Sequence, residues 1–397
     1  MLVNKGINIV EGLAGSSYLL EIDKLSMKHL YTVIVLDNNH QIDALYKEIN
    51  NIYSNKNILK FPDYGLGAYD NTKIDKTIIK DRYNCFMSLY SNNQERSIII
   101  TTYKSVFYKI PSLNDVAKSW KKISYKTKYN EILNMMNIFL YERTSKVSEP
   151  GQFRISGSII DIFPISSHKP IRINFFGDGI ENIKYFSTAT QRSEAEIKEA
   201  MICSEGIYMI GNENINFYKK GIDNYFTQEY IEDIEYEMIV NKKDNRNIHN
   251  LIPILFEHTS SLLSTINGSF ISYLHKDIIE EFKNQYNHLQ NVYSQEKVNK
   301  HIIQTSDLLI SEDELRKIVN DNYFYLASDY TNSKTLKTSY KPIPLIAINY
   351  NYKNPFINFE KFFNNSQYNY VFFIKRNDNY RTLTNYLTSK NISYKNV

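Results

Sequence analysis

Continuous apolar runs mark the first strands that the chain predicts. Residues 31–36 (YTVIVL) and 97–102 (SIIITT) lack polar alternation, as do strands that are covered on both faces of a parallel sheet. Between them, apolar residues recur at helical spacing over 42–52, and a longer helical stretch runs from about 75 to 90. Strands and helices that alternate in this way predict an α/β fold with a parallel sheet.

From about residue 119 the pattern changes to short alternating strands broken by Pro and Gly, which predicts a smaller, more antiparallel module. The polar, turn-rich stretch 331–341 predicts a linker before a last small unit. The expected organisation is therefore an α/β domain built from 1–118 and 210–335, interrupted by an inserted α+β domain over 119–209. A small α/β domain follows over 342–397.

The most informative strand is residues 171–176 (IRINFF), because its alternation sorts the side chains onto two faces. The core face is predicted to hold Ile171, Ile173 and Phe175. The opposite face then carries Arg172, Asn174 and Phe176, with its ends about 13 Å apart by strand rise. An arginine beside a large aromatic is typical of a protein interface. A strand that is buried on both faces is the alternative.

Charge gives little indication of a partner. Lys and Arg total 47 against 43 Asp and Glu, a net charge of +4, which permits nucleic-acid binding but does not indicate it. Residues 118–128 (KSWKKISYKTK) place lysines around Trp120 and Tyr125, a mixture that nucleic-acid-binding surfaces also use. A solvated strand-and-turn face is the default interpretation, and DNA is kept as a weak additional partner.

The cysteines and the apolar runs exclude several classes of protein. Cys85 and Cys203 form no CxxC motif and no Cys/His cluster, so a disulfide scaffold and a zinc site are both disfavoured and burial is expected. No run of about 18 apolar residues predicts a membrane span, and the start of the chain lacks a signal-peptide pattern. We therefore expect no membrane association and a cytoplasmic location.

No catalytic motif is complete. The loop GLAGSS supplies Gly12, Gly15, Ser16 and Ser17 but lacks the lysine of a phosphate-binding loop. The histidines show no HExxH motif, and no GxSxG elbow is present. We therefore predict no catalytic residue, no metal, no cofactor and no enzymatic activity for this chain.

Five segments together resemble the transcription-repair coupling factor family. They are GLAGSS, FPDYGLGAYD (61–70), EPGQFRISGSIIDIFP (149–164), PIRINFFGDGIENIKYF (170–186) and TATQRS (188–193). The related repair protein UvrB shares the third and fourth segments, but TQRS and the degenerate loop resemble the coupling factors. The chain is therefore identified as similar to their amino-terminal, UvrB-like portion.

The resemblance implies a fold and a role. It implies a degenerate helicase-like parallel-sheet domain, interrupted by a domain that binds the excision-repair subunit UvrA and followed by a small α/β domain. In the family, the domain that binds RNA polymerase and the motor domains come later, and we expect them to be absent here. The expected role is a noncatalytic part that recruits UvrA in transcription-coupled DNA repair.

The resemblance also implies a partner-binding site formed by two arginines and a phenylalanine. Arg172 and Phe176 match the second arginine and the phenylalanine. Ser156 stands where the family has the first arginine, so UvrA binding is expected to be weakened, and Arg154 on the same face is a candidate substitute. Gly179 stands where the family has an acidic residue.

Two other functions remain open. The chain is alternatively part of an ATP-dependent DNA translocase whose motor lies on a missing continuation beyond Val397. It is otherwise a degenerate remnant that folds but binds nothing, for which Ser156 is the motivating observation.

Overall fold

The computed structural model describes most of the chain. The described residues are 5–11, 17–53, 55–67, 69–70, 72–91, 95–206, 212–226, 248–266, 269–272, 277–297, 302–327, 335–337, 351–364 and 377–394.

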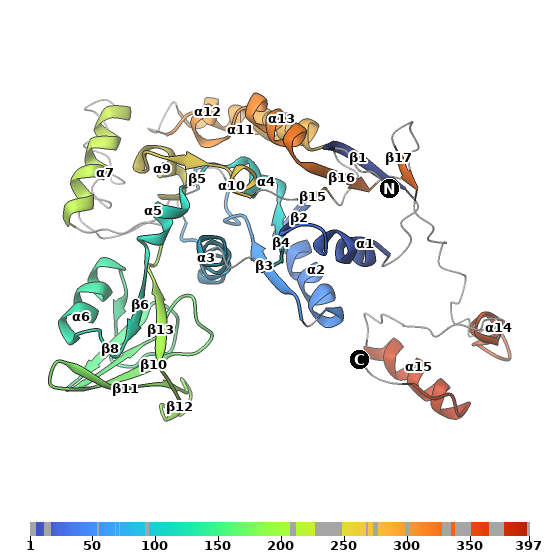
Figure 1. The fold of residues 1–397 in the computed structure, drawn as a ribbon, viewed down its shortest axis with the longest axis horizontal. Helices are drawn as coiled ribbons and strands as arrows, with labels where there is room; N and C mark the ends of the chain where they lie inside the picture. Colours follow the sequence, from blue (N-terminus) through green and yellow to red (C-terminus); the bar gives the residue numbers. More distant parts are fainter. Residues whose placement is uncertain are drawn as a thin grey trace.

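A seven-stranded sheet, in which every ladder is parallel, forms the centre of the larger domain, here called the parent domain (Figure 1). Its strand order is β17-β1-β16-β15-β2-β4-β3. The strands are β1 (Gly6–Glu11), β2 (Tyr31–Leu36), β3 (Asn57–Phe61), β4 (Ser97–Thr102), β15 (Ser269–Ser272), β16 (Tyr323–Ala327) and β17 (Thr335–Lys337). The apolar runs 31–36 and 97–102 are β2 and β4, so the predicted α/β fold is confirmed.

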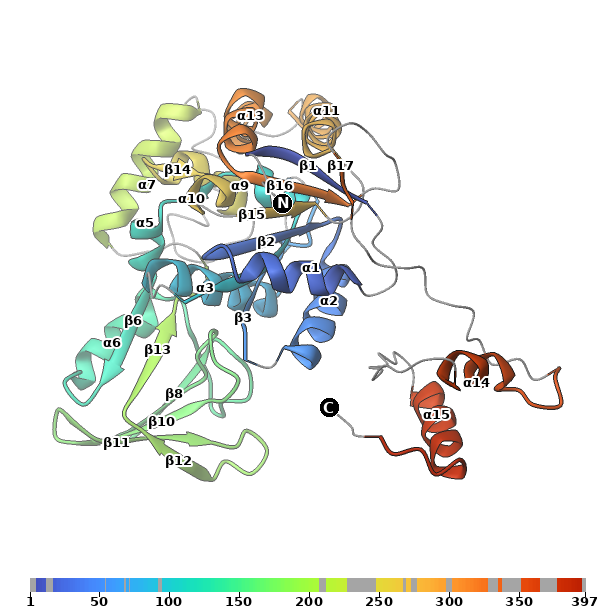
Figure 2. The ribbon, with the colours of Figure 1, turned by 45° about the vertical axis from the view of Figure 1, so that its right-hand side comes forward.

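Helices cover both faces of this sheet, which explains why its central strands β2 and β4 carry consecutive apolar residues at 33–36 and 98–100. Val33 and Val35 of β2 belong to the core on one face, whereas Ile34 and Leu36 belong to the core on the other. Apolar residues of α1 (Ser17–Ser26) and α2 (Asn39–Ile52) complete the smaller core (Figure 2). The larger core is completed by α3 (Lys76–Ser91), α4 (Tyr103–Phe107), α11 (Ile278–Glu296) and α13 (Glu312–Asp321).

The inserted module runs from β6 to β13 and contains a second sheet. Its elements are β6 (Trp120–Ser124), α6 (Tyr129–Ile138), β7 (Glu142–Arg143), β8 (Gln152–Ser156), β9 (Ile159–Ile162), β10 (Ile171–Phe176), β11 (Gly179–Phe186), β12 (Ser193–Ile197) and β13 (Glu199–Cys203). The six-stranded sheet has the order β12-β11-β10-β9-β8-β7 and is antiparallel except for β7 and β8. One face of β10 is core, as its alternation predicted, because Ile171, Ile173 and Phe175 are buried.

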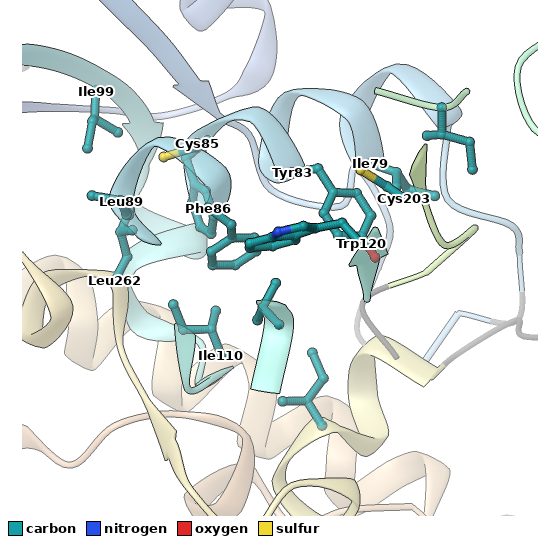
Figure 3. Close-up of a cluster of buried hydrophobic side chains, with 14 of the residues drawn as sticks. Ile79, Tyr83, Cys85, Phe86, Leu89, Ile99, Ile110, Trp120, Cys203 and Leu262 are labelled. Atoms are coloured by element: carbon teal, nitrogen blue, oxygen red, sulfur yellow. The ribbon is translucent and has the colours of Figure 1, made fainter. Parts of the chain in front are cut away.

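An antiparallel ribbon of β6 and β13 joins the module to the parent domain. Trp120 at the start of this ribbon packs edge-on against Tyr83 of α3, with ring centroids 6.1 Å apart, and against Tyr90 at 5.6 Å. Figure 3 shows Tyr83, Trp120 and Cys203 in one cluster. Cys85 and Cys203 are both buried, as predicted. A single core therefore continues from the larger face of the parent sheet into the module.

Shorter elements complete the described chain. They are β5 (Ile110–Pro111), α5 (Leu113–Ala117), α7 (Asn212–Tyr225), α9 (Ile248–Leu255), β14 (Thr259–Ser260), α10 (Leu262–Thr265), α12 (Thr305–Leu308), α14 (Ile357–Asn364) and α15 (Asn377–Ser389). The last two helices bury Phe359, Tyr386 and Leu387 in a cluster of their own. Among the described residues, no helix combines the length and the apolar character that crossing a bilayer requires.

The predicted linker over 331–341 is wrong in part, because three of its residues form strand β17. Thr335–Lys337 pair in parallel with Ile9–Glu11 of β1. The physical reason is that an edge strand is recruited through its main-chain groups, which the open edge of β1 supplies whatever the side-chain pattern.

Candidate functional site

Strand register lines up charged side chains across the module's sheet. Arg154 of β8 and Arg172 of β10 both lie opposite Asp161 of β9. Arg172 also lies opposite Lys184, which in turn lies opposite Glu196. Because alternate residues of these strands enter the core, this row lies on the other side of the sheet. We call that side the outer face; it carries Arg154, Ser156, Asp161, Arg172, Asn174, Phe176, Lys184 and Glu196.

Arg172 is held in a two-pronged ion pair on the outer face. Its Nε donates to Asp161 Oδ1 at 2.7 Å and its Nη2 donates to Asp161 Oδ2 at 2.9 Å. The Asp161 side chain is only 3% exposed and that of Arg172 is 18% exposed. Hydrogen bonds from Arg172 to this carboxylate raise the pKa of Arg172. Arg172 therefore presents little of its guanidinium to a partner, although its strand face is the predicted one.

The segment after β11 closes over the same guanidinium. Arg172 Nη1 donates to the carbonyl oxygen of Gln191 at 3.1 Å, and the guanidinium lies 4.9 Å from the centroid of the Phe186 ring. Gln191 adopts a φ of 57°, and its side-chain amide donates to the carbonyl oxygens of Thr188 at 2.8 Å and Val147 at 3.2 Å. The TQRS segment is thus fastened to Arg172 and to a neighbouring loop.

Phe176 is presented at the tip of the β10–β11 hairpin, and its side chain is 87% exposed. Gly177, with a φ of 59°, opens the two-residue turn between Phe176 and Gly179, a conformation that glycine adopts without strain. The preceding Phe175 points inward and packs edge-on against Tyr129 at 5.0 Å. The Tyr129 amide also donates to the carbonyl oxygen of Asp178 at 3.3 Å. The exposed ring therefore stands on an anchored hairpin.

Arg154 and Ser156 lie on the same face of the neighbouring hairpin. Ser156 is exposed at the end of β8, and Arg154 is half-buried. Among the described residues, the Arg154 side chain has no hydrogen bond or ion pair. The Phe175 amide donates to the carbonyl oxygen of Ser158 at 2.9 Å, which places the two hairpin tips at one end of the sheet. All four residues predicted for the partner site are thus brought to the outer face.

Gly179 occupies its position without any backbone requirement for glycine. It does not have a positive φ, and a Cβ built there would meet only the carbonyl oxygen of Phe176, at 3.7 Å. An acidic side chain would therefore fit at this position, and the backbone conformation does not require glycine there.

The basic segment 118–128 does not display its tryptophan. Trp120 is only 9% exposed, so its ring cannot serve as a surface on which bases stack. Lys118 pairs with Asp115 at 2.7 Å and Lys122 pairs with Glu199 at 2.9 Å. The geometry favours the solvated-face interpretation.

The predicted degenerate loop falls largely outside the described residues. Gly12, Gly15 and Ser16 are not described, and Ser17 is the first residue of α1. In the described part of the chain, no group of His, Cys, Asp and Glu side chains is arranged to hold a metal ion.

Asp161 and Gln191 complete the site but were missed as site residues from the sequence. A lone carboxylate inside the apolar strand IIDI was the available signal for Asp161, because a buried acid requires a partner. Gln191 accepts the hydrogen bond from Arg172 through its main-chain carbonyl oxygen. Every residue type has this group, so the sequence gives no indication of the contact.

Comparison with known proteins identifies the module. Residues 122–208 match the UvrB interaction domain. Proteins named transcription-repair-coupling factor also align with the chain. That of Rickettsia conorii is 27% identical over 270 residues, which cover 66% of this chain and 24% of the relative. That of Borreliella burgdorferi is 28% identical over 208 residues, covering 52% and 18%. That of Staphylococcus aureus is 24% identical over 213 residues, covering 53% and 18%.

The resemblance to an amino-terminal portion of a transcription-repair coupling factor is confirmed by these matches. The aligned part of the chain spans about a quarter of the Rickettsia conorii relative. The segment that matches the UvrB interaction domain contains the whole outer face described above.

Proposed function

We propose that this chain is a noncatalytic adaptor that recruits UvrA in transcription-coupled DNA repair through the outer face of its UvrB interaction domain. The observation that carries the proposal is Phe176, a residue that is 87% exposed on an anchored hairpin within the matched segment. A large aromatic held in water has no folding role that would retain it, whereas interface hot spots are rich in such residues.

The anchoring of Phe176 favours binding because the hairpin needs no ordering when a partner docks. Its neighbour Phe175 is packed on Tyr129, and the turn is tied to α6 through Tyr129 and Asp178. Burying an exposed aromatic ring in a partner pocket contributes about 2 kcal/mol or more. We therefore expect Phe176→Ala to weaken the UvrA complex at least ~10-fold.

The two arginines of the outer face have different roles in this proposal. Arg154 has no partner within the described chain and is the contacting cation. Arg172 is engaged by Asp161 and Gln191, so it acts mainly as a positioning residue. Arg154→Ala is then expected to weaken UvrA binding without changing stability, whereas Arg172→Ala weakens both together.

The primary experiment measures binding of the full chain to UvrA from the same organism, for the wild type and Phe176→Ala. Tyr352→Ala is the matched control, because Tyr352 is also an exposed aromatic, at 53%, but lies outside the module. Circular dichroism checks that each variant is folded. Saturable wild-type binding that is lost only in Phe176→Ala supports the proposal. No binding by the folded wild type would refute it and favour the remnant.

A gain-of-function variant tests the same site in the opposite direction. Ser156 is exposed beside Arg154 on the outer face, and an added arginine there has room at the hairpin tip. We expect Ser156→Arg to tighten UvrA binding ~5- to 10-fold, as one interface arginine contributes about 1 kcal/mol or more. Unchanged affinity would show that this position lies outside the contact.

The noncatalytic part of the proposal has its own test. The sequence around Gly12 lacks the lysine of a phosphate loop, so we expect no ATP turnover by this chain, with or without DNA. Clear turnover would favour the translocase alternative, as would a continuous reading frame encoding a motor beyond Val397.

A further inference from the structure

A cavity of about 380 Å³ lies in the parent domain between α3 and α9, away from the outer face. Its apolar wall includes Ile74, Ile79, Phe86 and Ile252, and its polar lining includes Arg82 and His249. Arg82 projects from α3, whereas His249 comes from α9, more than 160 positions later. An apolar cavity of this size with a few convergent polar groups is the usual form of a small-molecule site.

Arg82 is a buried cation that forms no ion pair with a carboxylate among the described residues. Its side chain donates from Nη1 to the Pro62 carbonyl oxygen at 2.7 Å and to Ser105 Oγ at 3.1 Å. The guanidinium carbon lies 3.9 Å from the centroid of the Phe61 ring and 4.2 Å from that of Tyr64. The residue is 3% exposed, and its Nε has no hydrogen-bond partner among the described atoms.

The acidic groups that line the cavity are already engaged. Asp75 accepts hydrogen bonds from the amide and hydroxyl of Thr77, each at 2.7 Å, at the start of α3. Glu205 lies 4.0 Å from Lys76 Nζ. Neither of them balances the charge of Arg82. The charge of Asp63 favours the Arg82 cation, but the two form no ion pair, and burying a cation without an ion-pair partner costs several kcal/mol.

His249 supplies a second unsatisfied group in the same lining. It is 8% exposed, and its Nδ1 has no hydrogen-bond partner among the described atoms. Burial, reinforced by the charges of Lys104 and Arg82, lowers the pKa of His249 to about 3. The neutral ring can therefore donate or accept one hydrogen bond at neutral pH. Native proteins rarely leave such buried atoms unpaired unless a ligand or water completes them.

A small adjoining cavity of about 20 Å³ shares Tyr64, Arg82 and His249 with the larger one. It is also lined by Asn250, whose Oδ1 and Nδ2 both lack hydrogen-bond partners within the described part of the chain. This space suits one water molecule. The larger cavity has a mainly apolar wall that water wets poorly, and it has room for a fused-ring body.

We propose that the larger cavity is a binding site for a small aromatic or alicyclic carboxylate. The apolar body would lie against Ile79, Phe86 and Ile252. Arg82 Nε and His249 Nδ1 are covered in the free chain, so both side chains would turn toward the carboxylate on binding and donate hydrogen bonds to it. The anionic head pairs the buried guanidinium, and the ring fills the apolar space. This site is separate from the outer face, so a test of carboxylate binding here is independent of any test of UvrA binding.

The experiment uses 1-naphthoate as the probe and 1-naphthalenemethanol as its neutral match, each titrated calorimetrically into the full chain. We expect the carboxylate to bind at one site at least ~10-fold more tightly than the alcohol, since a hydrogen bond to a charged group contributes about 1.5–3 kcal/mol. Equal affinity for the two, or no binding of the carboxylate at millimolar concentration, overturns the proposal.

Two further measurements locate the bound probe. In the wild type with ¹⁵N-labelled arginine, the Arg82 Nε resonance should shift on saturation with 1-naphthoate, a readout that needs no variant. Arg82→Met should remove the preference for the acid over the alcohol, whereas Arg316→Met on the surface of α13 should keep it. An unmoved Arg82 resonance at saturation would place the probe elsewhere and contradict the assignment.

Discussion

The ion pair between Arg172 and Asp161 gives a quantitative prediction. Asp161 is 3% exposed at the side chain, so Arg172→Ala leaves a buried carboxylate without its cation, a change that costs about 3–5 kcal/mol. Asp161→Ala should cost less, roughly 2–3 kcal/mol, because the guanidinium is partly exposed and keeps its bond to Gln191. The double variant no longer holds an isolated charge, so its loss should be smaller than the sum of the two.

The assay is hydrogen exchange by mass spectrometry on peptides covering β9 and β10. A local destabilisation of about 3 kcal/mol accelerates exchange ~100-fold. Lys184→Ala is the control, because Lys184 belongs to the same row but lies 3.9 Å from Glu196 at the surface, where a pair contributes about 0–1 kcal/mol. We expect a coupling of about 2 kcal/mol or more between Arg172 and Asp161. Strictly additive losses, or an Arg172→Ala effect no larger than that of Lys184→Ala, would refute the reasoning.

Three further predictions concern residues away from the outer face. The pKa of His249 lies near 3 instead of 6.5, so its contribution to stability is complete above about pH 6.5 and declines toward pH 3, by up to about 1.4 kcal/mol per pH unit. Urea titrations across that range should be flatter for His249→Gln, and identical pH profiles would contradict this. Burial raises the pKa of Cys85 and Cys203 to about 12, so iodoacetamide should alkylate them only after unfolding; modification of the native chain would contradict it. A Cβ on Gly221 would clash with the backbone carbonyl oxygen of Ile254 in α9, so Gly221→Ala should destabilise the fold by about 1–3 kcal/mol, and an unchanged melting temperature would count against that contact.

Sequence patterns predicted the strands in which burial follows a simple pattern, either on both faces or on alternate residues. Residues 33–36 and 98–100 are apolar without alternation because both faces are covered, and 171–176 alternates because one face is core. Cross-strand partners were harder to predict. The pairing of Arg172 with Asp161 depends on the length of the connection between β9 and β10, residues 163–170, which sets the register of these two strands.

Other features depend on contacts between distant parts of the chain. β17 forms because β1 has an open edge, which the polar composition of residues 331–341 does not reveal. The cavity requires Arg82, Glu205 and His249 to meet, although they belong to three elements that are far apart in the sequence. Neither propensity nor periodicity carries that information, since both describe neighbours along one element.

The β6–β13 ribbon has a mechanical consequence for any partner held at Phe176. Its strands are hydrogen-bonded from Trp120 and Cys203 to their far ends, and at its base Tyr83 of α3 shares a hydrogen bond of 2.7 Å with Ser204. A pulling force applied at the hairpin tip would therefore be shared by β6 and β13 and transmitted to α3. A partner docked at Phe176 would therefore move with the parent domain as one rigid unit, and not independently of it as on a flexible linker.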